Sequence, residues 1–121
     1  MASIFEATAG KLVGPATGGT VTQGTSKSTG VTLNAPSGQI TMHNASLADA
    51  AEVTFTVTNS YVAATDVVVV NHGSADTAGA YLVQANTIAA GSFKITVSNV
   101  SGGSLGEAIV LNFVALKGAS S

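Results

Sequence analysis

Four consecutive valines, Val67–Val70, are the feature that most constrains how this chain folds. Successive side chains of a β-strand point to opposite faces, so the run places a β-branched side chain on both faces of one strand. A strand with a single buried face would alternate apolar and polar residues instead. The run therefore predicts a strand with protein on both sides, either in the centre of a sheet or packed against a neighbouring subunit. The polar residues Asn71–Ser74 follow it and suit a turn.

Two other segments, Glu52–Asn59 and Ser92–Asn99, alternate between apolar and polar residues, as strands with one buried face do. We expect their apolar side chains to face the core: Val53, Phe55, Val57, Phe93, Ile95 and Val97. Shorter strand-like stretches lie at residues 20–23, 31–33, 39–43 and 80–85, and the longest one occupies residues 107–116.

These segments amount to about eight strands at close spacing, separated by turn-forming residues and by no long helix. The pattern predicts an all-β fold, an antiparallel β-sandwich or jelly roll. A parallel βαβ arrangement is excluded, because the connections are too short for crossover helices. The last strand contains a second non-alternating run, Ala108–Leu111, so we expect it in mid-sheet beside the valine run. Two such strands in so small a sandwich imply that another subunit covers part of the outer surface.

The chain divides into three parts on this pattern: an N-terminal arm at residues 1–17, a β-sandwich domain at 18–117 and a C-terminal tail at 118–121. The arm fits neither helix nor strand for long, which is typical of a loosely ordered terminus. The alternative is an arm that lies on a neighbouring subunit, anchored by Ile4 and Phe5.

Only 8% of the 121 residues are charged, against about 25% in an ordinary soluble domain. The net charge is -2, which offers no basic footprint for nucleic acid and no polybasic patch for a membrane surface. There is no cysteine, so disulfides and thiolate metal sites are excluded. The first residues lack the pattern of a signal peptide. If the protein works outside a cell, we expect lysis to release it.

Residues that could support chemistry are few. The two histidines, His43 and His72, would form a zinc site only if Asp49, Asp66 or Asp76 converged on them, and a polar loop role is the simpler interpretation. A serine with His72 and Asp76 would supply a Ser-His-Asp triad, but no Gly-x-Ser-x-Gly elbow is present. We therefore predict no catalytic, cofactor-binding or metal-binding residue, and a protein that is not an enzyme.

Seven segments together resemble a module of tailed-bacteriophage and prophage structural proteins: Gly18–Leu33, Ser37–Met42, Val53–Asn59, Ala64–His72, Ala78–Tyr81, Ser92–Leu105 and Glu107–Phe113. The resemblance covers roughly residues 18–117, the whole predicted sandwich. It implies a small, β-rich virion protein with a structural role and no catalytic residues. Such proteins occur on the head surface or as a domain of tail-fibre proteins.

On this basis we expect a head decoration (cement) protein, a homotrimer that binds the phage major capsid protein in the virion and needs no cofactor, nucleic acid or membrane. The candidate capsid or subunit contacts are Ile4, Phe5, Val67 and Val69. The alternative is a receptor- or glycan-binding domain of a tail fibre, which would use the loops Gly24–Gly30 and His72–Gly79.

Overall fold

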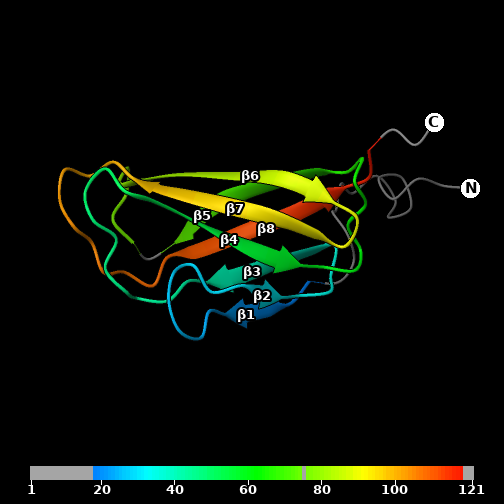
Figure 1. Ribbon diagram of the computed structural model, residues 1–121, viewed down its shortest axis with the longest axis horizontal. Coiled ribbons are helices and arrows are strands. Elements are labelled where there is room, and N and C mark those ends of the chain that lie inside the picture. Colours follow the sequence, from blue (N-terminus) through cyan, green and yellow to red (C-terminus); the bar gives the residue numbers. More distant parts are fainter. Residues whose placement is uncertain (1–17, 75, 119–121) are drawn as a thin grey trace, which may run out of the picture.

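The computed structural model describes residues 18–74 and 76–118 (Figure 1). These ranges contain eight strands and no helix, which confirms the all-β prediction for this part of the chain. The strands are β1 (Thr20–Thr22), β2 (Val31–Thr32), β3 (Ser37–Thr41), β4 (Glu52–Thr58), β5 (Val67–Ser74), β6 (Tyr81–Ala89), β7 (Ser92–Asn99) and β8 (Val110–Leu116). Accordingly, the described residues include no helix that could cross a membrane.

The strands form two four-stranded sheets, and the fold is a β-sandwich. Sheet A has the order β1-β3-β8-β5, and sheet B has the order β2-β4-β7-β6. Two pairs are parallel, β1 with β3 and β2 with β4, so the expectation of a purely antiparallel sandwich is wrong at these two places. The reason lies in the path of the chain. Strands β1 to β4 alternate between the sheets, so every second strand returns to the same sheet in the same direction.

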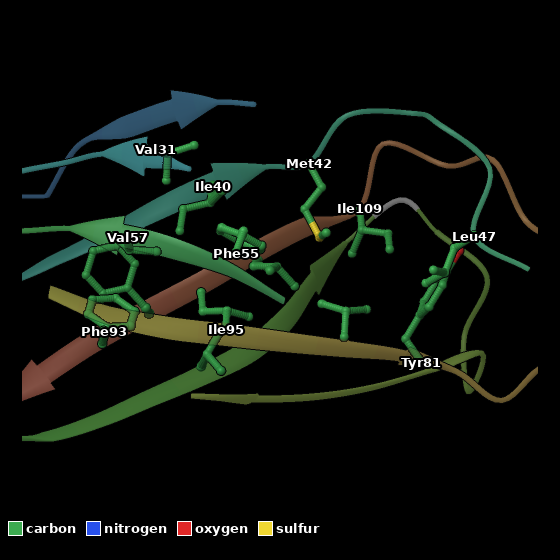
Figure 2. Packing of buried hydrophobic residues seen from close by; sticks show 14 of the residues in the cluster. Val31, Ile40, Met42, Leu47, Phe55, Val57, Tyr81, Phe93, Ile95 and Ile109 are labelled. Carbon is green, nitrogen blue, oxygen red and sulfur yellow. The ribbon is translucent and has the colours of Figure 1, made fainter. Parts of the chain in front are cut away.

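The core lies between the sheets, where the alternating strands place their apolar side chains (Figure 2). Five of the six residues predicted to face inward are buried, and Val53, near the start of β4, is half-buried and packs against the same core. Phe93 of sheet B and Phe113 of sheet A pack with their ring centroids 5.3 Å apart, which ties the two sheets together. The period-two prediction for β4 and β7 is confirmed.

The valine run forms β5, which lies at the edge of sheet A and not in its centre. Val70 is buried and Val68 partly buried, whereas Val67 is 54% and Val69 42% exposed. A run without alternation indicates that both faces of the strand are apolar, but it does not indicate what covers the second face. In the described residues no layer of this chain covers it. The central position is therefore wrong, and packing against a neighbouring subunit stays a prediction.

The prediction for the last strand is confirmed, because β8 lies in mid-sheet between β3 and β5. It begins at Val110, later than expected, and the residue before it, Ile109, is fully buried.

Strand β5 is longer than expected, because it continues through Asn71–Ser74, where we expected a turn. An irregularity between His72 and Ser74 replaces the turn, and an added Cβ on Gly73 would lie 2.9 Å from the Val110 carbonyl oxygen.

Candidate functional site

A polar cluster of five side chains lies where β5 ends and β6 begins. One side chain comes from the β1–β2 loop, three come from the stretch between the end of β5 and the start of β6, and one comes from the segment before β8. We call it the loop-end cluster, and its members are Lys27, His72, Asp76, Tyr81 and Glu107. The sequence pointed to His72 and Asp76, but it gave no local sign that the other three residues join them.

Lys27 is the least expected member, because a Gly/Ser/Thr-rich loop predicts solvent-exposed side chains. It is only 4% exposed. Its ammonium group donates to the backbone carbonyl of His43 and, at 2.5 Å, to that of Glu107. Burial lowers the pKa of Lys27, and the nearby carboxylates of Asp76 and Glu107 oppose that shift. The buried ammonium therefore fastens the β1–β2 loop to two distant parts of the chain.

His72 and Asp76 do come together, with 2.7 Å between His72 Nε2 and Asp76 Oδ2. The Asp76 side chain is almost fully buried and also accepts a hydrogen bond from the Val110 backbone N–H at 3.2 Å. The His72 ring meets the edge of Tyr81, with ring centroids 5.6 Å apart. Among the side chains that the structure describes, no serine hydrogen-bonds to His72.

Glu107 holds the loop before β6 in place. Its carboxylate accepts a 2.5 Å hydrogen bond from the Tyr81 hydroxyl and a 2.8 Å bond from the Thr77 hydroxyl. The bond from Tyr81, followed by that from Thr77, lowers the pKa of Glu107. Burial, followed by the bond to Glu107, raises the pKa of Tyr81 above its ordinary value. The cluster is thus a set of mutually satisfied groups that tie loops together.

The other carboxylates considered for a zinc site lie elsewhere. Asp66 precedes β5 and is held by the Ala63 backbone N–H at 2.9 Å and by the Lys117 ammonium at 2.9 Å. The Ala63 bond is the largest cause of its lowered pKa. Asp49 accepts a hydrogen bond from the Gly102 backbone N–H. The described residues contain no group of three His, Asp or Glu side chains that could hold a metal ion.

The outer face of sheet A carries an exposed apolar patch at its β5 border. We define the apolar patch as Val67, Val69 and Leu116, with the half-buried Val114 between them. In the sheet register Val67 lies opposite Leu116 and Val69 opposite Val114, so the four side chains share one face. Val67 and Val69 were predicted contact residues. Leu116, which is 37% exposed, was missed, although its even spacing from Val114 on the last strand was a usable signal.

A row of amides borders the apolar patch, with Gln39 of β3, Asn112 of β8 and Asn71 of β5 in register. The Gln39 amide donates to the Asn112 side-chain oxygen at 3.1 Å. The four strands of sheet A contain no Asp, Glu, Lys or Arg. This face is therefore apolar at one border, amide- and hydroxyl-bearing beyond it, and without Asp, Glu, Lys or Arg in its strands.

The outer face of sheet B has a different character. Thr54 and Thr96 hydrogen-bond to each other through their hydroxyls at 2.8 Å, and the Asn86 amide donates to Thr96 at 2.9 Å. Leu82 is 63% exposed there, beside Ser98 and not beside another large apolar side chain in the sheet register. Sheet B thus presents a hydroxyl-rich face, and the apolar patch belongs to sheet A.

Scans against protein-family models, curated proteins and solved structures found no match to this chain. The resemblance to phage structural proteins therefore stays a hypothesis. The predicted contacts of Ile4 and Phe5 lie outside the described residues.

Proposed function

We propose that this chain is a structural, non-enzymatic protein of a phage virion that binds the outer surface of the assembled capsid and stabilises it. The observation that carries the proposal is the apolar patch of Val67, Val69 and Leu116 on the uncharged outer face of sheet A. Clustered exposed apolar side chains on an otherwise polar domain mark an interaction surface.

The mechanism is the burial of this patch against the major capsid protein. Each Å2 of apolar area removed from water contributes about 25 cal/mol, so a few hundred Å2 on each subunit would contribute several kcal/mol before the cost of association. A homo-oligomer would present several such patches at once, and linked contacts raise the overall affinity through a high local concentration. The homotrimer that the resemblance implies and the jelly-roll topology that the strand pattern predicts belong to this proposal as well. Light scattering that gives a mass near three chains would support this trimer, and a mass near two chains would exclude it.

The hydrogen bonds of the loop-end cluster to other parts of the chain support a structural role over a catalytic one. Three of its charged side chains make hydrogen bonds within the chain: Lys27, Asp76 and Glu107. Groups held in this way fix the loops that carry them.

Co-sedimentation with capsids assembled from the major capsid protein encoded alongside this chain tests the proposal. We expect the chain to pellet with capsids and Leu116→Lys to bind at least about tenfold more weakly, because the charge would have to be desolvated at the contact. Leu82→Lys, an exposed leucine on sheet B, is the matched control and should bind like the wild type. A wild-type chain that does not pellet with capsids would refute the proposal.

A second candidate function is receptor or glycan binding by a tail fibre, and one observation favours it. The two loops predicted for that role, Gly24–Gly30 and His72–Gly79, are fastened to the same residue. Lys27 donates to the Glu107 carbonyl, and Thr77 donates to the Glu107 carboxylate. The loops therefore lie close together and could form one recognition surface. Binding to host surface polysaccharide without capsid binding would select this function.

A further inference from the structure

In the described part of the chain, the regular part of the long edge strand β5, Val67–His72, lacks the features that usually protect a sheet edge from pairing with another chain. Natural edges are shortened, charged, interrupted by proline or covered. The other edge of sheet A, β1, has three residues, and the β2 edge of sheet B has two. β5 has eight residues with no charge and no proline, and in the described part of the chain it pairs with β8 alone.

The second long edge, β6, is also irregular towards its end, between Asn86 and Ala89, where Thr87 takes a positive φ of 52°. The two edges differ instead in the side chains of their regular parts. The outward side chains of β6 after Leu82 are Gln84 and Asn86, which water solvates well. The corresponding side chains of β5 are Val67 and Val69, which are exposed although apolar. The chemistry therefore singles out β5.

We infer that β5 is the contact between two copies of this chain, which pair antiparallel through this edge about a twofold axis. The regular part of β5 ends at the irregularity after His72, so its centre lies near Val69. Pairing about Val69 places Val69 opposite its counterpart in the second copy and Val67 opposite Asn71. A twofold contact brings each surface against itself, so a charged edge would repel its copy. Neither β5 nor β8 contains Asp, Glu, Lys or Arg.

This pairing also accounts for the position of the apolar patch at the border of the sheet. Edge-to-edge pairing would join the two A sheets into one eight-stranded sheet with both outer faces on the same side. The two patches, each with Val67, Val69 and Leu116, would merge into one apolar area at its centre. The resulting dimer would present twice the apolar surface to any partner that sheet A contacts.

Single-cysteine crosslinking tests the pairing, because the chain has no cysteine of its own. Directly opposite residues in antiparallel strands have Cα atoms about 4.5–5.5 Å apart, within the range that a disulfide spans. We expect Val69→Cys to give a covalent dimer on mild oxidation. Leu116→Cys lies one strand further in, opposite Val67. In this pairing it is about 14 Å across the strands and about 14 Å along them from its counterpart, roughly 20 Å in all, and should not crosslink. Gln84→Cys, on the β6 edge, is the second control and should also stay uncrosslinked.

Light scattering on the uncrosslinked chain provides the second measurement. We expect a mass near two chains of 11.8 kDa for the wild type and near one chain for Val69→Lys, with unchanged circular dichroism. An equimolar mixture of Val69→Lys and Val69→Glu should recover the dimer, since opposite charges would then face each other. A wild-type monomer, a mass near three chains, or crosslinking of Gln84→Cys as readily as Val69→Cys would overturn the inference.

The twofold pairing does not depend on capsid binding. Light scattering tests the pairing, and co-sedimentation tests capsid binding. A monomer that binds capsids would keep the proposed function and overturn the twofold pairing. A dimer that ignores capsids would do the reverse.

Discussion

The buried ammonium of Lys27 gives the sharpest test of how the loops are held. Lys27→Met keeps an unbranched side chain of similar length and removes only the charged donor. We expect this change to lower the free energy of unfolding by about 2–3 kcal/mol, a large share of the roughly 5–15 kcal/mol of a typical domain.

The magnitude follows from two opposing contributions. Lys27 donates to the carbonyl oxygens of His43 and Glu107. Hydrogen bonds from a charged donor contribute about 1.5–3 kcal/mol each, so the loss of both costs about 3–6 kcal/mol. The variant no longer has to desolvate an ammonium group, which offsets part of that loss. The lowered pKa of Lys27 shows that this desolvation cost is present in the folded protein.

Urea unfolding at neutral pH, followed by far-ultraviolet circular dichroism, measures the difference. Lys94→Met is the matched control, because Lys94 is exposed on β7 and should change stability by less than about 0.5 kcal/mol. If Lys27→Met were as stable as Lys94→Met, the two carbonyls would be finding other partners and Lys27 would not fasten the loop.

Three further predictions concern the same end of the sandwich. Because the folded state raises the pKa of Tyr81, the unfolded chain loses the proton first, so wild-type stability should fall as pH rises above about 10. Tyr81→Phe should lack that part of the decline in pH-dependent urea midpoints. The folded state lowers the pKa of Glu107, so the ionised carboxylate stabilises the fold above its ordinary pKa of 4.5, and this stabilisation is lost as pH falls through the lowered pKa of the folded state. Glu107→Gln should therefore lose less stability than the wild type as the pH is lowered. Gly73→Ala places a Cβ 2.9 Å from the Val110 carbonyl oxygen and should destabilise by about 1–3 kcal/mol, whereas Gly24→Ala, with open space around it, should not.

The sequence predicted those parts of the fold that depend on local periodicity. In β4 and β7 the alternation of apolar and threonine or serine residues is a property of neighbouring positions, and it correctly assigned the inward faces. The valine run lacks that information. Four apolar residues in a row indicate a strand, but the position of a strand within its sheet depends on pairings between distant residues. β5 pairs with β8, about forty positions away, so its edge position had no local signal.

The loop-end cluster was only partly predictable for the same reason. His72 and Asp76 are four residues apart, and their pairing was considered from the sequence. Lys27 finds its acceptors 16 and 80 positions away, at His43 and Glu107. A lysine inside a Gly/Ser/Thr-rich loop looks solvent-exposed until the fold brings buried carbonyl oxygens to it.

The placement of charge links the fold to the proposed role. Lys27, Asp66, Asp76 and Glu107 lie at the ends of strands and in connections, where they make hydrogen bonds within the chain. Sheet A is left with no Asp, Glu, Lys or Arg in its strands. Binding through such a face depends on apolar contact and backbone pairing, which dissolved salt does not screen, whereas contacts between exposed charges weaken as the screening length falls to about 3 Å at 1 M salt. Dimerisation and capsid binding should therefore change little between low and high salt, and a steep loss of either would show that charged residues elsewhere form the contact.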